Sequence, residues 1–439
     1  MRKILLVNPW IYDFAAYDLW IKPWGLLKIS AILKKNGFSV SFVDATDRHH
    51  PLLDKPVKDF PDGTGKFLDE EVEKPEALKD IPRRFKRYGL PVDIFTKTLP
   101  QEDVDLILVS SGMTYWYPGA FEAIRILRER YNTAKIVLGG TYATLARDHA
   151  IVNSGADYVI PNKDLSQLSS VLGKECDFSF KNILDEAIDY DWYENPGYAV
   201  LRISLGCPFD CAYCAQKKLG PGFILKDEEK AINEIESLYE KGIKNFAFYD
   251  DALLFKRDYL KRYLRRIGPK GIKAGFYTPN GLHARFIDME TADLMKKVGF
   301  INPILSLEIA SDEKGRTWHD KVTMKELEYA VTCLRKAGYK DGEHMVYLML
   351  GVPGSDAKDT MESIDRVHSL GAKISLSEFS PVSGTKLASS FTEAHKEPLY
   401  QNNSAFPSFD ISEWDEIKAI KAYARKLNSL VLSGRKNHQ

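Results

Sequence analysis

Cysteine, net charge and long apolar runs are all scarce in this sequence of 439 residues, and each scarcity excludes a class of protein. Lys plus Arg and Asp plus Glu both number 61, so no excess of one charge favours nucleic acid or an anionic membrane surface as a partner. No apolar run approaches the roughly 20 residues that a membrane span requires. The apolar part of the opening MRKILLVNPW is too short for a signal peptide. The sequence therefore predicts neither a membrane span nor a secretory leader.

The five cysteines are too few and too unevenly placed for a disulfide framework. Three of them fall within eight positions, 207 to 214, while Cys176 and Cys333 stand alone. Such usage is typical of a reducing, cytoplasmic setting. The two isolated cysteines are predicted to be buried thiols rather than ligands.

With 44% hydrophobic residues, a chain of this length predicts two or three domains. Residues 1–165 alternate apolar strands with helical patterns. Strands that are apolar throughout and joined by helices predict a buried parallel sheet in a doubly wound, Rossmann-like domain. The predicted strands are 3–9, 39–45, 104–112, 135–140 and 157–161, and the predicted helices are 24–37, 118–131 and 142–155.

Two segments interrupt this pattern. Residues 47–103 hold several prolines and many charges, and form an insertion where a single helix would suffice. Insertions of that length are often functional or disordered. Residues 166–196 are irregular and acidic, which predicts a linker packed between domains.

Residues 197–385 form a second strand–helix series, which predicts a partial (β/α)6 barrel of the TIM type with its chemistry at the carboxyl ends of the strands. Residues 386–439 are predicted to be a helical extension that caps the barrel, with an amphipathic helix in EWDEIKAIKAYARKLNSLVL. The overall prediction is thus an α/β protein with two domains and a helical tail. The predicted barrel strands are 198–206, 245–251, 272–279, 303–310, 344–354 and 373–381.

The cysteines of CPFDCAYC lie on the loop that leaves the first barrel strand. Cys207, Cys211 and Cys214 are soft ligands suited to zinc, copper(I) or iron–sulfur clusters. A structural zinc site needs a fourth ligand, and none is obvious nearby. A 4Fe–4S cluster held by three thiolates instead leaves one iron open to chelate a substrate or cofactor. A zinc site and a plain electron-transfer cluster remain the alternatives.

This C-x3-C-x2-C pattern, with Tyr213 before the last cysteine, resembles the radical S-adenosylmethionine (SAM) superfamily. The resemblance implies that Cys207, Cys211 and Cys214 are catalytic as well as metal ligands. In that family the open iron binds the methionine part of SAM. One electron from the cluster then cleaves SAM to methionine and a 5′-deoxyadenosyl radical. The resemblance also implies a reductant partner such as flavodoxin or ferredoxin.

Further stretches match the SAM-binding strands of the family. In NFAFYDD, Asp250 and Asp251 would contact the amino group of SAM, although solvated turn aspartates are the plainer reading. In SLEIAS, Glu308 would bind the ribose, and a charge within an apolar strand needs a partner in any case. In YLMLGVPG, the backbone at Leu350 and Gly351 would lie against adenine, with a simple strand-end turn as the alternative.

The stretch YTPNGLHARF is unusually polar for a strand exit and resembles the segment that lines the substrate side of the family's barrel. Asn280, His283 and Arg285 are therefore candidates for substrate contact. Each of them alone is also typical of a structural hydrogen-bonding residue.

The first domain resembles the cobalamin-binding subgroup of the superfamily, through VNPW, VSSGMT and IVLGGTYATL. Ser111 and Met113 match the turn that lines the slot for the cobalamin nucleotide tail, and Gly139 with Gly140 matches the glycine pair beside it. The Asp-x-His-x-x-Gly loop that supplies a cobalt-ligating histidine in other domains is absent. The aromatic patch formed by MTYWYP (113–118) with Trp10, Trp20 and Trp24 predicts either a corrin contact or an interdomain core.

The resemblance implies a radical SAM enzyme that binds a 4Fe–4S cluster, SAM and cobalamin and methylates an unactivated carbon. A dehydratase, cyclase or other oxidoreductase without methyl transfer is the alternative, and a non-catalytic cobalamin or iron–sulfur carrier is a further one. A small-molecule or natural-product substrate is expected, and no motif identifies it.

Overall fold

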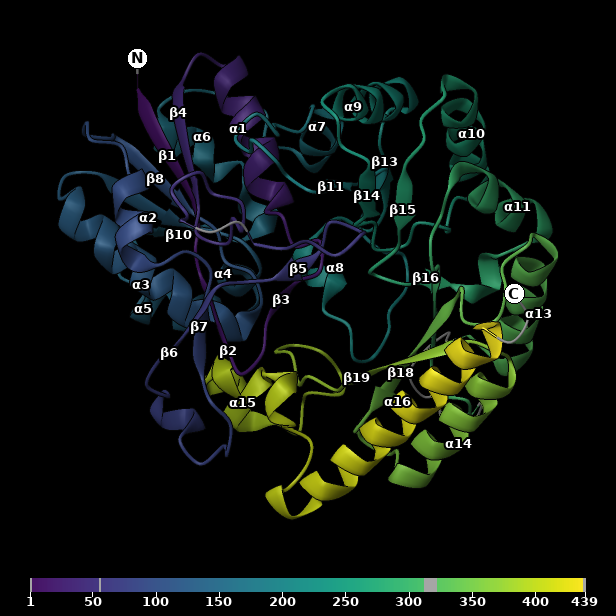
Figure 1. The fold of residues 1–439 in the computed structure, drawn as a ribbon. Coiled ribbons are helices and arrows are strands. Elements are labelled where there is room, and N and C mark those ends of the chain that lie inside the picture. Colours follow the sequence, from purple (N-terminus) through teal and green to yellow (C-terminus); the bar gives the residue numbers. More distant parts are fainter. Residues whose placement is uncertain (1, 55–56, 312–321, 437–439) are drawn as a thin grey trace.

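The computed structural model describes residues 2–54, 57–311 and 322–436. Two α/β units lie side by side, and the C-terminal segment runs beneath both (Figure 1). Residues 55–56 of the predicted insertion and 437–439 of the predicted extension lie outside the described residues. None of the described helices is long and apolar enough to cross a membrane.

The first unit is built on a five-stranded parallel sheet in the order β10-β9-β8-β1-β4 (Figure 1). From β1 the chain continues to β4 at one edge of the sheet, and from β8 it continues to β9 and β10 at the other edge. The direction therefore reverses between β1 and β8, and such a reversal creates a ligand crevice at the carboxyl ends of these two strands. The predicted doubly wound fold is therefore confirmed. Its strands are β1 (Lys3–Asn8), β4 (Ser39–Asp44), β8 (Leu106–Val109), β9 (Lys135–Leu138) and β10 (Tyr158–Val159).

Both faces of this sheet are covered by helices, because its strands carry apolar side chains on both faces. Leu5 and Val7 pack with one set of helices, and Ile4 and Leu6 pack with the other. Each such side chain stabilises the fold by roughly 1.5–3 kcal/mol through burial. The first set is α2 (Val92–Thr98), α3 (Tyr117–Arg130), α4 (Thr141–Leu145) and α5 (Arg147–Asn153), and the second is α1 (Trp24–Lys35), α6 (Gln167–Leu172) and α7 (Phe180–Asp185).

The insertion folds against the loop that follows β1. Arg48 is buried and pairs with Asp18 and Asp59, each at 2.8 Å, which fixes the start of the insertion. One antiparallel sheet has the order β2-β7-β6 and a second pairs β3 with β5. These strands are β2 (Ile11–Asp13), β3 (Tyr17–Asp18), β5 (Gly65–Lys66), β6 (Asp69–Glu71) and β7 (Lys86–Tyr88), with a 3-10 turn η1 (Glu76–Leu78).

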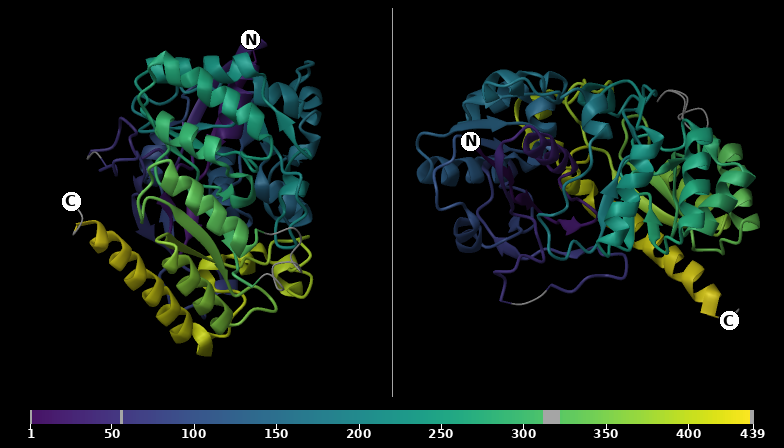
Figure 2. Two further views of the ribbon diagram at one scale, coloured as in Figure 1. Left: turned by 90° about the vertical axis from the view of Figure 1, so that its right-hand side faces the viewer. Right: turned by 90° about the horizontal axis from the view of Figure 1, so that it is seen from above.

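The second unit is the predicted partial barrel (Figures 1 and 2): a parallel strand lies within each of the six predicted strand segments, and β16 is a further short strand that the sequence did not predict. They form two sheets, β11-β14-β15 and β16-β17-β18-β19, which a single bridge between Phe276 and Phe300 connects. The strands are β11 (Ala199–Leu201), β14 (Asn245–Phe248), β15 (Gly275–Tyr277), β16 (Leu282–His283), β17 (Ile304–Glu308), β18 (Met345–Leu350) and β19 (Lys373–Glu378). The helices are α9 (Glu228–Glu240), α10 (Arg257–Ile267), α11 (Met289–Val298), α13 (Met324–Lys336) and α14 (Ala357–Ser369).

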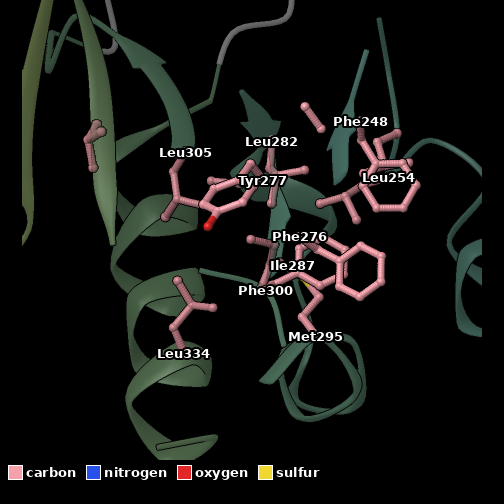
Figure 3. Packing of buried hydrophobic residues seen from close by; sticks show 14 of the residues in the cluster. Phe248, Leu254, Phe276, Tyr277, Leu282, Ile287, Met295, Phe300, Leu305 and Leu334 are labelled. Atoms are coloured by element: carbon pink, nitrogen blue, oxygen red, sulfur yellow. The ribbon is translucent and has the colours of Figure 1, made fainter. Parts of the chain in front are cut away.

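Aromatic packing holds the junction where backbone hydrogen bonds are sparse. The rings of Phe248, Phe276 and Phe300 stack with centroids 5.5–6.0 Å apart. Figure 3 shows Phe276 and Phe300 beside Met295 of α11. Aromatic pairs of this geometry add about 0.5–1.5 kcal/mol beyond burial, so the two sheets are joined mainly by side chains.

The last helix, α16 (Trp414–Lys436), packs along β19 and α14 (Figure 1). Asn428 on this helix accepts a hydrogen bond from the N–H of Ile374 at 2.7 Å and donates one to its carbonyl at 2.8 Å. The side chain thus takes the place of a neighbouring strand at the open edge of the barrel, which shields that edge from pairing with another chain.

Before α16, the chain returns to the first domain through α15 (Thr392–Lys396) and the 3-10 turns η6 (Pro398–Gln401) and η7 (Asn403–Ala405). The buried carboxylate of Asp13 accepts hydrogen bonds from Asn402 at 3.0 Å, Ser404 at 2.8 Å and the indole of Trp116 at 2.8 Å. The extension therefore contacts both domains, which the sequence did not predict. The domain boundaries at 165, 196 and 385 stay predictions.

The two domains also meet directly. Lys28 on α1 is fully buried and pairs with Glu234 on α9 at 2.5 Å, and Lys226 reaches the same carboxylate at 2.8 Å. Burial lowers the pKa of Lys28 to about 7. Since a buried charge without its partner costs several kcal/mol, this cluster favours one docking of the domains over others.

Candidate active site

The three clustered cysteines lie between the hairpin strand β12 (Ser204–Leu205) and the short helix α8 (Gln216–Leu219); the hairpin partner of β12 is β13 (Ile224–Leu225). Gly206 opens the loop with φ +86°, and a Cβ there would lie 2.2 Å from the carbonyl oxygen of Pro221. Only glycine fits this turn. Cys207 and Cys211 are half-buried and Cys214 is exposed. Cys176 and Cys333 are buried in separate cores, away from this loop.

The cysteine thiols influence one another. Although Cys214 is exposed over part of its surface, desolvation of its thiol raises its pKa to about 11, and charge on Cys211 and Cys207 adds to the rise. Within the described ranges, no three His, Cys, Asp or Glu side chains lie close enough together to ligate one metal ion. A polynuclear cluster, in which each thiolate binds a different iron, does not need that close spacing.

Asp250 and Asp251 support the cysteine loop from β14. The buried carboxylate of Asp250 accepts hydrogen bonds from the N–H of Ile203 at 3.1 Å and from the N–H and hydroxyl of Ser204 at 2.6 Å. Asp251 accepts from the N–H of Gly206 at 2.9 Å and pairs with Arg202 at 3.1 Å. Desolvation raises the pKa of Asp250 to about 7. Both aspartates therefore shape the loop that carries Cys207; their predicted contact with SAM stays a prediction.

Glu308 lies at the carboxyl end of β17, in a strained conformation. Its φ is +71°, and the pairing of β17 with β18 shifts register between Ser306 and Glu308. A residue other than glycine in this region costs of order 1–3 kcal/mol and marks a site where geometry serves function. The Tyr213 hydroxyl donates a hydrogen bond to its carboxylate at 3.0 Å. The structure thus links the predicted ribose ligand to the residue before Cys214.

We expect Glu308→Gln to stabilise the ligand-free protein at alkaline pH. Desolvation raises the pKa of Glu308 from about 4.5 to about 7. The folded state therefore binds the proton more tightly than the unfolded state, and its stability falls as the pH rises from 4.5 to 7. Glutamine avoids this loss, so the variant's gain in free energy of unfolding should grow from nearly zero at pH 4.5 to about 2–3 kcal/mol at pH 8. Urea titrations across this range measure it; a gain independent of pH would contradict the prediction.

Leu350 and Gly351 end β18 beside the C-terminal extension. Gly351 has φ +74°, and a Cβ there would lie 2.3 Å from the ring of Phe409. Both residues line a depression of about 650 Å³ together with Phe409 and the start of α14. One face of Gly351 is therefore covered by an aromatic ring from the extension, and the predicted adenine contact stays a prediction.

The three predicted substrate contacts have separate surroundings. Asn280 donates to the carbonyl of Tyr249 at 2.9 Å, and the ring of His283 packs 4.9 Å from Phe209 of the cysteine loop. Arg285 pairs with Glu326 of α13 at 2.7 Å. His283 is thus brought to the cysteine loop, whereas Arg285 is engaged with an outer helix. Their roles toward a substrate remain predictions.

The predicted nucleotide-tail residues meet at the carboxyl ends of β8 and β9. The hydroxyl of Ser111 donates to the carbonyl of Gly139 at 2.5 Å. Gly140 has φ +94°, and a Cβ there would lie 2.3 Å from the carbonyl oxygen of Ser111. Met113 is exposed. Three of the four, Ser111, Met113 and Gly140, line one cavity.

This cavity, of about 460 Å³, lies between the two domains at the crevice of the first sheet. Trp10, Trp24 and Trp116 line it from the first domain, and Arg202 and Tyr249 line it from the barrel. Trp20 instead stacks on Tyr277 at 5.0 Å and joins the domains. The aromatic patch therefore serves both as cavity wall and as interdomain contact.

Two polar atoms of the cavity wall are buried without a hydrogen-bond partner among the described residues, the indole N–H of Trp24 and Nε of Arg202. Lys22 also lines the cavity, and no carboxylate among the described residues does. Sequence reasoning named Trp24 as a candidate corrin contact, and it missed Arg202 and Lys22 as site residues. Of these two, only Arg202 carried a signal, as a charge within the apolar run AVLRISLG.

Comparison with known proteins identifies the second unit. A profile of the family described as "Radical SAM superfamily" matches residues 201–367, which include the cysteine loop and α14 up to residue 367. These residues are a radical SAM domain. The match agrees with the resemblance inferred from the cysteine spacing.

Two curated relatives are similar over part of the chain. The anaerobic magnesium-protoporphyrin IX monomethyl ester cyclase of Cereibacter sphaeroides is 27% identical over 199 residues, 42% of this chain and 31% of the cyclase. The ribosomal protein uS12 methylthiotransferase RimO of Acetivibrio thermocellus is 27% identical over 175 residues, 38% of each chain. The matched segments thus span about a third of the length of these relatives.

Two solved structures share the fold over most of the chain. TsrM from Kitasatospora setae, a radical SAM methyltransferase with cobalamin and a [4Fe-4S] cluster bound, has a TM-score of 0.64 at 16% identity and covers 89% of this chain and 78% of its own. The cobalamin-dependent radical SAM enzyme OxsB has a TM-score of 0.57 at 11% identity, covering 93% and 57%. The fold of this chain is therefore similar to that of these two enzymes over most of its length.

Proposed function

We propose that this radical SAM protein is a cobalamin-dependent enzyme that methylates an unactivated carbon of a small molecule. One observation carries the proposal: the interdomain cavity combines the crevice of a doubly wound sheet with the mouth of a barrel whose cysteine loop lies alongside. Arg202 and Asp251 connect the two, because Arg202 lines the cavity and Asp251 holds Gly206 at the start of the cysteine loop.

The residues of the cysteine loop fit a 4Fe–4S cluster with one open iron. Cys207, Cys211 and Cys214 supply three soft ligands from one loop, and desolvation keeps the Cys214 thiol protonated until a cation is present. Glu308, which accepts a hydrogen bond from the Tyr213 hydroxyl, would also accept hydrogen bonds from the SAM ribose. The cluster and SAM supply the radical chemistry; the protein holds the reacting groups in line and excludes water.

The cavity also fits a large, partly apolar ligand that carries anionic and amide groups. Three tryptophans give flat apolar walls, while Arg202, Lys22 and the indole N–H of Trp24 offer donors. Gly140 keeps the backbone of the β8 and β9 turns close together and adds no side chain of its own to the slot. Cobalamin, with its corrin amides and its nucleotide phosphate, has this chemistry and would supply the methyl group.

Anaerobic reconstitution tests the proposal. Protein prepared with iron, sulfide and cobalamin should show the absorbance of a 4Fe–4S cluster and of bound cobalamin. With SAM and a strong reductant it should form 5′-deoxyadenosine, and with its substrate also S-adenosylhomocysteine. Cofactor binding without SAM cleavage would support a carrier instead, and zinc in place of iron would refute the cluster.

The second candidate is a radical SAM enzyme that forms a ring without transferring a methyl group. The curated relative from Cereibacter sphaeroides, a cyclase, favours it. Such an enzyme should form 5′-deoxyadenosine but no S-adenosylhomocysteine in the presence of its substrate. The ratio of these two products therefore separates the candidates.

A further inference from the structure

A surface depression of about 660 Å³ opens directly onto the cysteine loop. It is lined by Lys163 after β10, Phe180 of α7, Cys207, Pro208, Lys217 of α8 and residues 220–222. Of the three predicted cluster ligands, Cys207 is the one among the residues that line this depression. A molecule seated here would touch a ligand of the cluster without entering the interdomain cavity.

The depression is positively charged. Lys163 and Lys217 line it, and no carboxylate among the described residues does so. The nearest acidic residue of the cysteine loop, Asp210, pairs with Lys217 at 3.4 Å and with Lys386 at 2.9 Å. Because two lysines and no carboxylate line the depression, and Lys386 also pairs with Asp210, the lining itself carries a net positive charge.

Apolar residues line this surface together with the lysines: Phe180, Pro208 and Pro221. A surface that combines apolar residues with charges of one sign is typical of a protein docking site, where the charges steer the encounter and the apolar residues provide the contact. A small anion would need converging donors in an enclosed site, which this open surface does not provide.

We propose that this surface, defined by Lys163, Phe180, Cys207, Pro208 and Lys217, is the docking site for an acidic electron-transfer protein. The inference rests on the proposed function, since cleavage of each SAM consumes one electron. An anionic flavodoxin hydroquinone gives up that one electron and becomes the neutral semiquinone, and the cluster that the cysteine loop would hold accepts the electron. A protein docked here would lie directly against Cys207, one of the three predicted cluster ligands.

Charge-reversal variants test the proposal on the loaded protein. Lys163→Glu and the double variant Lys163→Glu/Lys217→Glu invert the lining. The matched control is Lys97→Glu/Lys297→Glu, which inverts two exposed lysines that each pair with a carboxylate one helical turn away. Two readouts are compared: the Kd for oxidised flavodoxin by calorimetry at low and high salt, and the rate of 5′-deoxyadenosine formation. The rate is driven either by flavodoxin hydroquinone or by reduced methyl viologen, a small cation.

The double variant should bind flavodoxin at least about tenfold more weakly at low salt, with a smaller loss at high salt, because steering between surface charges is screened. Its rate with flavodoxin should fall accordingly, while its rate with methyl viologen and its iron content stay unchanged. The control should match the wild type in every readout.

An unchanged Kd for flavodoxin in the double variant would overturn the proposal, and would indicate that the depression serves as an entrance for substrate. If 5′-deoxyadenosine formation with methyl viologen also slows in the double variant, the single variant Lys163→Glu is used to test the proposal, because Lys163 lies outside the cysteine loop. Wild-type protein that binds flavodoxin but forms no 5′-deoxyadenosine with either reductant would refute the proposed function and leave the docking result intact.

Discussion

The triple variant Cys207→Ala/Cys211→Ala/Cys214→Ala should lose the brown colour of the reconstituted protein and at least about 10³-fold of its SAM cleavage. The three thiols are the only cysteines on the loop between β12 and α8. Alanine supplies no ligand, so no iron remains to bind SAM or to deliver its electron. Iron and sulfide content, the visible spectrum and 5′-deoxyadenosine formation measure the loss.

The matched control replaces the two remaining cysteines. Cys176 and Cys333 are buried in separate cores, one packed under the first sheet and one on α13. Their replacement by alanine leaves only small cavities, which cost about 1 kcal/mol each and should not alter the cluster. Cleavage retained by the triple variant, or lost equally by the control, would refute the assignment of the three ligands.

Gly140→Ala should destabilise the first domain by about 3 kcal/mol or more and weaken cobalamin binding with it. A Cβ at Gly140 would lie 2.3 Å from the carbonyl oxygen and 2.7 Å from the nitrogen of Ser111, and both are backbone atoms that cannot move aside cheaply. The turns after β8 and β9 would separate, and these turns line the cavity. Urea titration followed by tryptophan fluorescence reports on this region, because Trp10, Trp24 and Trp116 line the same cavity.

The variant Gly37→Ala separates the cost of the left-handed backbone conformation from the cost of the steric overlap between a Cβ and a neighbouring backbone atom. Gly37 also has positive φ, +79°, but a Cβ there would meet nothing within 4 Å. Its replacement should cost only about 1 kcal/mol, the penalty of the left-handed backbone conformation itself. Equal losses of unfolding free energy in the two variants would show that the steric overlap with Ser111 does not contribute to the destabilisation.

The two series of parallel strands were predictable from the sequence because most of their strands are apolar runs that end at turn residues. The boundaries were less predictable. The predicted strand 198–206 is split in the structure into β11 and β12. The cause is Asp250, which takes the N–H groups of Ile203 and Ser204 that a continuous strand would have paired elsewhere.

The site was predictable only where its residues are local in sequence. The cysteine spacing identified the radical SAM domain, as the family match over residues 201–367 bears out. Lys22 acquires its place in the cavity wall only when the two domains pack together, and no local pattern encodes that. The contacts of Asp13 with Asn402 and Ser404 join residues nearly 390 positions apart, which periodicity cannot reveal.

Those same contacts bear on how the protein matures during synthesis. Trp116, part of the wall of the interdomain cavity, donates its indole N–H to Asp13, and Asp13 is completed by Asn402 and Ser404. The first domain leaves the ribosome long before these two residues do, because chains emerge from the N-terminus. Until nearly the whole polypeptide has been translated, one side of the cavity lacks its final support. A bulky cofactor thus has an interval for insertion that closes when the last tenth of the chain folds back.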